Sequence, residues 1–238
     1  TDPQNDSYDT IFFAKRNIRQ VFIPPYIKKI KPYAFSSCAY LQYVEIPENS
    51  ALEVIGERAF YNSNIFKLFI PKSVKTIEKN AFGLCNYLYK IEFSENCEIN
   101  SIPEELFMYS SIKSFNIPAN VVEIKDNWCK EANYLTFISI SSKNKFFSVF
   151  ENKMIVGKSD INSDTYDVLY FVSRNVKEIN IPSFIKKINS FALSNLQNLK
   201  TVTFSDDSQL EIIGKSAFSE SSITKISIPK NVEIIDDN

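Results

Sequence analysis

One sequence frame recurs along the chain at almost constant spacing, and it constrains the fold more than any other feature. An apolar residue opens the pattern L-x-x-V-x-I, which Pro or Ser usually follows, and this frame occurs nine times in 238 residues. The opening residues are Ile18, Leu41, Ile65, Leu88, Ile112, Leu135, Val176, Leu199 and Ile223. The steps between them alternate between 23 and 24 residues, except for one step of 41. The full sequence period is therefore a pair of repeats, 47 residues long.

A repeat this short cannot bury its apolar face alone, so each repeat is expected to form one turn of a solenoid stacked around a continuous core. Within V-x-I, alternate residues point inward and outward. Successive turns then place these strands side by side in one parallel front ladder of nine rungs, about 4.8 Å apart. The shorter V-x-x-I stretch is expected to form a second ladder or extended segment on the opposite wall.

Composition removes several classes of function. Lys plus Arg (27) nearly balance Asp plus Glu (28), so there is no long-range field to attract nucleic acid. No apolar run approaches the roughly 20 residues that cross a bilayer. The chain has no histidine, which excludes Ser-His-Asp and HExxH chemistry. Its 4 glycines cannot assemble a phosphate-binding loop. No cofactor and no metal are expected.

The repeats resemble the BspA-like, treponemal-type leucine-rich repeat family, whose unit reads I-P-x-x-V-x-x-I-x-x-x-A-F-x-x-C-x-x-L-x-x-V-x-I. The phrases IPKSVKTIEKNAFGLCNYLYKIEF and SFIKKINSFALSNLQNLKTVTF carry the resemblance, and the Ala-Phe pair recurs in register. Ala-Phe is replaced by Leu106-Phe107, Trp128-Cys129 and Ala192-Leu193 in three repeats. The resemblance implies a mainly β solenoid with short helical or irregular turns, a right-handed superhelix with a parallel sheet on its concave face. It also implies a cell-surface or secreted protein that attaches to host or matrix proteins.

The expected organisation is a single solenoid over residues 1–238. Residues 1–17 are interpreted as a degenerate first repeat. The last segment, IPKNVEIIDDN, stops where Ala-Phe should follow, and we expect a solenoid truncated within a repeat. The step of 41 holds about 17 extra residues, placed within 141–175. There the apolar runs FFSVF, MIV and VLYFV are separated by ENK and by GKSDINSDTYD, a pattern that predicts a hairpin, a loop and a third strand.

Two interpretations of the loop from Gly157 to Asp167 remain open: it projects and contacts a partner, or it caps a change in solenoid curvature. Two interpretations also apply to the back wall, where Lys28 and Lys29, Lys75, and Lys186 and Lys187 alternate with Glu53 and Glu211. In the first interpretation the lysines form a docking patch for an anionic partner. In the second, the lysines and glutamates form a solvated ladder of opposite charges on neighbouring rungs. We favour the solvated ladder.

The four cysteines are expected to be free. Cys38 and Cys85 lie in one column two turns apart, roughly 10 Å by strand spacing, beyond disulfide reach. Cys129 takes a Phe position in the core, whereas Cys97 lies in a corner of another turn. The cysteine count therefore does not indicate a redox compartment. Asn5-Asp6-Ser7 is a glycosylation sequon, which is a weak signal in so short a pattern.

The outward residues of the front ladder carry aromatics only in the first six rungs. Exposed aromatics beside charges are typical of interface cores, whereas the last three rungs carry short polar or charged groups. We expect a protein partner to bind the amino-terminal part of this face, although aromatics also favour strands without any ligand. The candidate binding residues are Phe22, Tyr43, Lys67, Phe69, Lys90, Glu92 and Phe137.

The sequence thus favours a noncatalytic protein-binding module of a cell-surface or secreted protein, concerned with adhesion. The alternative is an intracellular scaffold or structural repeat array. An enzyme using the carboxylates of Glu45 and Glu92 is a third possibility, although these residues lie two rungs apart on an open ladder. The partner's identity and the oligomeric state do not follow from the sequence.

Overall fold

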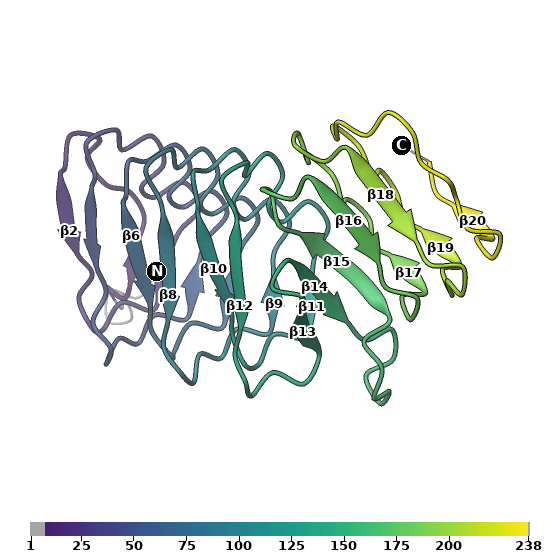
Figure 1. Cartoon of the computed structure of the whole chain (residues 1–238). Helices are drawn as coiled ribbons and strands as arrows, with labels where there is room; N and C mark the ends of the chain where they lie inside the picture. The colour runs from purple at the N-terminus through teal and green to yellow at the C-terminus, as the bar shows by residue number, and fades with distance from the viewer. Residues whose placement is uncertain (1–7, 238) are drawn as a thin grey trace.

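The computed structural model describes residues 8–237 and shows a β-solenoid of about ten turns (Figure 1). The sequon at Asn5 and the first seven residues of the proposed degenerate repeat lie outside this range. The solenoid with parallel sheets is confirmed. Of the expected helical or irregular turns, residues 8–237 contain the irregular kind, with strands and turns but no helix. It follows that this range holds no helix able to cross a membrane.

The front ladder is a parallel sheet of six strands in the order β12-β10-β8-β6-β4-β2. Each strand coincides with the V-x-I stretch of one repeat, because inward apolar residues there alternate with outward polar or aromatic residues. The strands are β2 (Gln20–Phe22), β4 (Tyr43–Glu45), β6 (Lys67–Ile70), β8 (Lys90–Phe93), β10 (Ser114–Ile117) and β12 (Phe137–Ile140).

The predicted nine-rung front ladder is wrong in length. After β12 it is interrupted, and it resumes as a separate pair, β16 (Glu178–Ile181) and β18 (Thr201–Phe204). The ninth frame, which opens at Ile223, forms no strand. The interruption falls at the insertion, which lies between the sixth and seventh frames (Figure 1).

The opposite wall carries short strands, each covering the end of a V-x-x-I stretch. They are β1 (Thr10–Ile11), β3 (Lys29–Ile30), β5 (Val54–Ile55), β7 (Thr76–Ile77), β9 (Ser101–Ile102), β11 (Glu123–Ile124), β17 (Lys187–Ile188), β19 (Ile212–Ile213) and β20 (Ile234–Ile235). Neighbouring rungs pair in parallel, for example Ile30 with Ile55 and Ile188 with Ile213. The second ladder predicted from the sequence is therefore present, in segments of four, two and four parallel strands once β15 (Val168–Val172) of the insertion is included.

The Ala-Phe corners form a third set of contacts between rungs. Backbone N–H groups donate to the next turn, as in Phe35 to Ala59 O (2.7 Å) and Phe60 to Ala81 O (2.9 Å). The residue before Ala and the second residue after Phe adopt positive φ, as at Arg58 (52°) and Asn62 (56°). None of the positive-φ residues is glycine, so the corners keep a left-handed backbone that costs most residue types about 1–2 kcal/mol each. Inter-rung hydrogen bonding explains why these corners are not helices.

The corner phenylalanines stack along the axis of the first half. Rings of Phe35 and Phe60 lie 5.0 Å apart at 4°, and Phe60 and Phe82 lie 5.8 Å apart at 19°. The stack continues to Phe107 and ends at Trp128, whose ring meets Phe107 at 68°. Stacking at the repeat spacing is possible because every turn places the same ring at the same point. The Trp128-Cys129 substitution is where this order ends.

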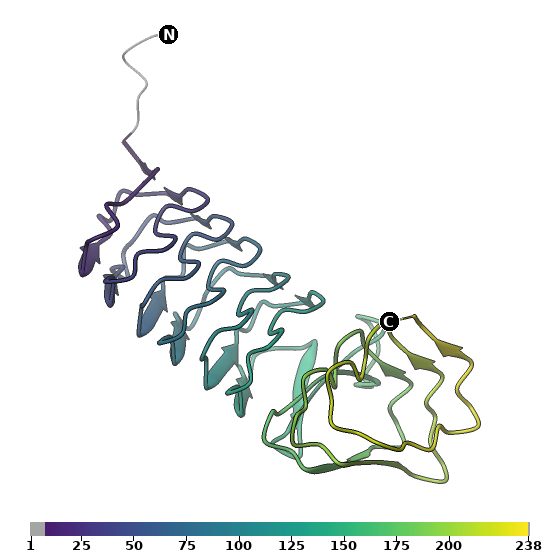
Figure 2. The same ribbon diagram turned by 90° about the horizontal axis from the view of Figure 1, so that it is seen from above.

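The insertion forms an antiparallel hairpin, β13 (Phe147–Phe150) and β14 (Met154–Gly157), followed by β15 (Val168–Val172). β15 also pairs in parallel with β17, so it serves as a rung of the back ladder. This small sheet lies between two separate apolar cores. Ile155 and Phe171 pack into the first core, whereas Met154 and Val172 pack into the second. Both faces of β14 and β15 are consequently buried, and the two halves of the solenoid run in different directions on either side (Figure 2).

Two buried polar residues hold this junction. The Asn144 side chain donates to Pro118 O (2.8 Å) and Val121 O (2.9 Å) and accepts from the N–H groups of Phe146 and Phe147. The Arg174 guanidinium is buried, donates to Ser194 O in the second half, and lies 3.3 Å from Cys129 Sγ in the first. Arg174 therefore bridges the two cores without a carboxylate partner among residues 8–237.

All four cysteines are free and buried. Ser63 lies between Cys38 and Cys85 in the same column, with its hydroxyl 3.7 Å from Cys85 Sγ, which agrees with the two-turn separation. Burial raises the pKa of Cys85 to about 12 and that of Cys129 to about 11. Cys97 also packs in the first core, although the sequence placed it only at a corner. With these raised pKa values, the thiols of Cys85 and Cys129 are protonated near neutral pH.

Candidate functional site

The seven candidate residues lie on one face, because they occupy the two outward positions of the front strands. Phe22, Tyr43 and Phe137 expose 51%, 56% and 63% of their surface, which is high for aromatic side chains. Lys67, Lys90 and Glu92 are exposed as well, and Phe69 is half-buried. Direct register pairs link neighbours, with Tyr43 opposite Lys67 and Phe69 opposite Glu92. We call this set the binding face.

Two adjoining hollows cover the binding face. The first has a volume of about 430 Å³ and is lined by Phe22, Tyr43, Lys67, Phe69 and Glu92, among others. The second, of about 630 Å³, extends from Phe69 and Glu92 to Phe137. Phe69 and Glu92 line both hollows, so the two form one open trough across β2 to β12. All seven candidate residues thus line a single concavity.

The charged candidate residues of the binding face are Lys67, Lys90 and Glu92. Lys90 and Glu92 form an ion pair at 2.6 Å on the same strand. This hydrogen bond raises the pKa of Lys90 and lowers the pKa of Glu92. Lys67 stands opposite Lys90, and no ion pair engages it among the described residues. Lys67 is therefore the cation on this face most available to an anionic group of a ligand.

The back wall carries ion pairs of the kind that a solvated charge ladder predicts. Lys75 pairs with Glu53 on the neighbouring rung at 3.1 Å, and Lys28 pairs with Asp9 at 3.2 Å. Lys186 and Lys187 form no ion pair with Glu211 within the described chain. The contacts support the ladder interpretation for the first half and leave the lysines of the second half solvated.

The loop between β14 and β15 projects from the lower edge of the solenoid in Figure 1. Its base is closed by Asp167, which is buried and accepts hydrogen bonds from Ser159 N (2.9 Å) and Ser159 Oγ (2.8 Å). Lys158 lies over the ring of Tyr166, with Nζ 5.4 Å from the centroid. The loop is thus ordered at its base and exposed at its tip, and it sits where the solenoid changes direction.

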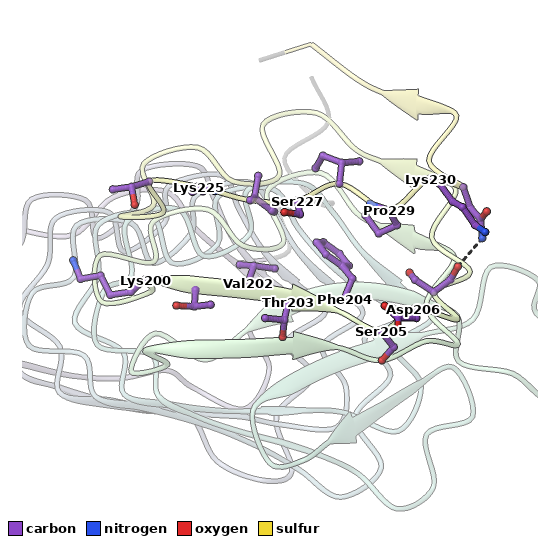
Figure 3. Close-up of a pocket in the computed structure, with 16 residues that line it drawn as sticks. Lys200, Val202, Thr203, Phe204, Ser205, Asp206, Lys225, Ser227, Pro229 and Lys230 are labelled. Carbon is purple, nitrogen blue, oxygen red and sulfur yellow. Dashed lines mark hydrogen bonds between the residues drawn. The ribbon is translucent and has the colours of Figure 1, made fainter.

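The front face of the second half has a different lining. Its largest hollow, about 850 Å³, lies between β18 and the unpaired segment 224–231. Figure 3 shows this segment running alongside β18, with Lys200 at one end of the hollow and Asp206 and Lys230 at the other. The outward side chains here are threonines, serines and lysines, and Phe204 is the one aromatic residue in the lining. This hollow therefore lacks exposed aromatic anchors.

The sequence interpretation missed an aromatic edge beside the binding face. Tyr40, Tyr87 and Tyr134 occupy the position just before the frame opener in alternate repeats, and all three are exposed. Phe66 joins this edge to the face, since its ring makes edge contacts with Tyr43 (5.8 Å) and Tyr87 (6.1 Å). The exact 47-residue spacing of the three tyrosines is the signal that could have found them.

The geometry gives little support to acid–base chemistry on this face. Glu45 and Glu92 lie on β4 and β8, two rungs apart, about 9.6 Å by strand spacing. Glu92 is held by Lys90, which lowers its pKa and disfavours the protonated form that a general acid needs. The arrangement is suited to contact with a surface rather than to enclosure of a small substrate.

Solved structures of similar fold support the architecture. The pneumococcal vaccine antigen PcpA matches with a TM-score of 0.81 and 22% identity, over 94% of this chain and 55% of that one. A leucine-rich repeat protein from Eubacterium ventriosum matches with a TM-score of 0.69 and 19% identity, over 92% and 60%. A leucine-rich cell surface protein from Faecalibacterium prausnitzii matches with a TM-score of 0.64 and 20% identity, over 92% and 69%. At these identities the likeness shows the fold.

The chain spans little more than half the length of PcpA and of the Eubacterium protein. No curated protein matches its sequence. The model of the BspA type leucine-rich repeat region, by contrast, matches residues 7–157 and 158–238 with six copies of the repeat. The resemblance noted in the repeats is confirmed, and the chain belongs to the BspA-type leucine-rich repeat family.

Proposed function

We propose that this chain is a noncatalytic protein-binding module of a cell-surface or secreted protein, and that it adheres to host or extracellular matrix proteins through the binding face. The observation that carries the proposal is the continuous trough, which gathers all seven outward residues of β2 to β12 that the sequence singled out. A solenoid offers such a face because its repeats extend one surface without closing a pocket.

The composition of the trough fits a protein partner. Aromatic side chains, Tyr among them, are enriched at protein interfaces, and Tyr is one of the residue types that most often dominate binding energy there. Tyr43 and Phe69 both line the first hollow, and Lys67 stands opposite Tyr43 in the register. A partner loop carrying an apolar side chain and a carboxylate would bury the rings and pair with Lys67.

The surface location is supported by the family and by similar structures. One of them is described as a leucine-rich cell surface protein and another as a vaccine antigen. Labelling intact cells with an impermeant reagent, followed by mass spectrometry of this protein, tests the location. Labelling only after lysis would favour the alternative, an intracellular scaffold or structural array.

Binding is tested with an array of purified host and matrix proteins and a Tyr43→Ser/Phe69→Ser variant. Loss of two anchors is expected to cost about 2 kcal/mol or more, a weakening of roughly 30-fold in Kd, with the fold retained because both side chains point outward. Thr201→Ser/Thr203→Ser changes the outward residues of β18 and serves as the matched control. If both variants bind the protein captured on the array with equal affinity, the proposed role of the binding face is rejected.

Deletion of residues 158–166 separates the two interpretations of the insertion loop. Gly157 and Asp167 are kept, so the deletion removes the whole loop, including Ser159 that bonds to Asp167, and keeps every residue of β14 and β15. We expect partner affinity to be unchanged, because the loop sits where the solenoid turns and away from the trough. A loss of affinity comparable to that of the Tyr43/Phe69 variant would assign the contact to the loop instead.

A further inference from the structure

The aromatic edge beside the binding face has a regular spacing. We call the five residues directly before the frame openers of the second to sixth repeats the tyrosine strip: Tyr40, Asn64, Tyr87, Ser111 and Tyr134. The three tyrosines expose 59%, 56% and 60% of their surface. A smaller residue separates each pair, so the strip alternates a projecting ring with a shorter side chain, Asn64 or Ser111.

Backbone hydrogen bonds fix the spacing of the strip. The residue two positions after each strip residue donates its backbone N–H to a carbonyl of the preceding rung, with N···O distances of 2.9–3.2 Å. The donors form an unbroken series: Gln42, Phe66, Tyr89, Lys113 and Thr136. Rungs joined in this way stand about 4.8 Å apart. Successive tyrosines are therefore about 9.6 Å apart, and the strip spans roughly 19 Å.

This edge also has a one-sided charge. Each repeat contributes four residues to this edge, from the residue before the opener to the second residue after it. In the first six repeats these positions hold four cations, Arg19, Lys67, Lys90 and Lys113, and no carboxylate. Of these cations, Lys90 alone forms an ion pair in the described range, with Glu92 on the binding face. An occupant of the strip therefore meets aromatic rings and uncompensated positive charge, which complements a chain that carries carboxylates.

The spacing distinguishes between kinds of occupant. A polyproline II segment turns once in three residues and rises about 9.3 Å per turn, close to the 9.6 Å between tyrosines. An α-helix repeats a face after seven residues and about 10.5 Å, so it falls out of register by nearly 2 Å along the strip. A β-strand repeats a face every two residues, about 6.7 Å, and matches neither the rings nor the gaps. Polyproline II segments also bind aromatic-lined grooves in known recognition modules.

We propose that the tyrosine strip binds an acidic, proline-rich segment in the polyproline II conformation, with one turn of the segment seated in each gap between tyrosines. The inference deepens the proposed function, on which it rests, by naming the chemistry of the partner segment. Lys67 and Lys90 belong to both surfaces, and Phe66 connects them, so one partner can span the strip and the binding face.

The second half lacks the tyrosines of this arrangement, although it keeps cations at Lys177, Lys200 and Lys225. The corresponding strip positions are Asn175, Asn198 and Ser222, without a tyrosine. Glu178 brings a carboxylate to the edge, and the backbone series is limited to Lys200 N–H donating to Lys177 O (2.8 Å). The second half therefore serves as an internal comparison for the proposed site.

The test is titration of the full chain with a Pro-Pro-Glu repeat peptide of about nine residues, roughly 28 Å in polyproline II form and longer than the strip. We expect a Kd below about 1 mM by fluorescence anisotropy. Tyr87→Ser should weaken binding at least tenfold, whereas Phe184→Ser, an exposed aromatic of the second half, should not change it. A Gly-Gly-Glu peptide keeps the charge but lacks the conformation, and a Pro-Pro-Lys peptide reverses the charge; both should bind more weakly.

Equal binding of the Gly-Gly-Glu peptide, or an unchanged Kd for Tyr87→Ser, would overturn the inference. Failure of this inference is distinguishable from failure of the proposed function. If a matrix protein loses affinity for Tyr43→Ser/Phe69→Ser while the proline-rich peptide does not bind, the binding face stands and the polyproline segment is wrong. If the peptide binds the strip but no arrayed protein responds to the face variant, the strip stands and the proposed function fails.

Discussion

The two halves of this solenoid share one repeat but present different surfaces. Residues 8–140 form a six-stranded front ladder with a phenylalanine stack inside and aromatics outside, whereas residues 176–230 form a two-stranded ladder with aliphatic packing and short polar residues outside. The inward positions are similar in both halves, because each turn must fill the same core. The outward positions are free of that constraint, and we propose that their difference reflects the binding of a partner to the first half.

The core of the first half should be the more sensitive to losing an aromatic ring. Phe82 is fully buried between Phe60 and Phe107, and Phe82→Ala is expected to lower the free energy of unfolding by about 3–5 kcal/mol. Leu193→Ala, at the matching position of the second half, should cost about 2–5 kcal/mol and lie below the Phe82 value. Chemical denaturation measures both. A larger loss at Leu193 would contradict the view that ring stacking distinguishes the halves.

The boundary between the halves should depend on Asn144. Asn144→Ala leaves two backbone N–H groups and two carbonyls without this partner, and we expect a loss of about 3 kcal/mol in denaturant unfolding. Asn120 makes a single side-chain bond, to Cys97 O at 2.8 Å, and Asn120→Ala should cost about 1 kcal/mol. Equal effects of the two variants would show that the junction is not specially held.

Buried thiols occur only in the first half among residues 8–237, and the raised pKa of Cys85 should make stability depend on alkaline pH. Cys85 ionises near 9 when unfolded and at about 12 when folded. Its contribution is therefore complete below pH 9 and is lost as the pH rises toward 12, by about 1.4 kcal/mol per unit. Cys85→Ser, which copies Ser63 in the same column, should flatten the slope between pH 9 and 11 by that amount. An unchanged slope would argue against burial of the thiol.

The left-handed corners should respond alike in both halves. Ser37 and Glu220 occupy the same corner position with φ of 56° at each, and both side chains are exposed. Asn tolerates this conformation better than other residues, and it already occupies the position at Asn62 and Asn195. Ser37→Asn and Glu220→Asn should each raise the free energy of unfolding by about 0.5–1 kcal/mol. A gain in one half alone would mean that the corners are not equivalent.

Much of the fold could be predicted because the repeat determines it. The positions of the front strands, the outward rows and the free cysteines all follow from a period that places identical residues at identical points. The interruption after β12 could not be predicted, because the sequence shows that residues are inserted but not that β15 takes over a rung of the back ladder. The left-handed corners were missed as well, since residues as different as Tyr33, Arg58 and Leu84 adopt them.

The candidate site was predictable only in part. Alternation along the strands located Phe22, Tyr43 and Phe69, but it does not extend to residues outside the strands. Tyr40, Tyr87 and Tyr134 lie in turns, where no two-residue period operates, and they become visible as a group once the 47-residue pairing is applied to every position. The trough itself depends on how far rings project, which a one-dimensional pattern does not contain.

The most direct test of the central claim is a hydrogen-exchange footprint of the whole chain with and without the protein retained from the matrix array. The account predicts slower amide exchange in the six front strands β2, β4, β6, β8, β10 and β12 and along residues 40–43, 87–90 and 134–137. Exchange in β16, β18 and residues 158–166 should be unchanged. Protection confined to the second half or to the insertion loop would contradict it.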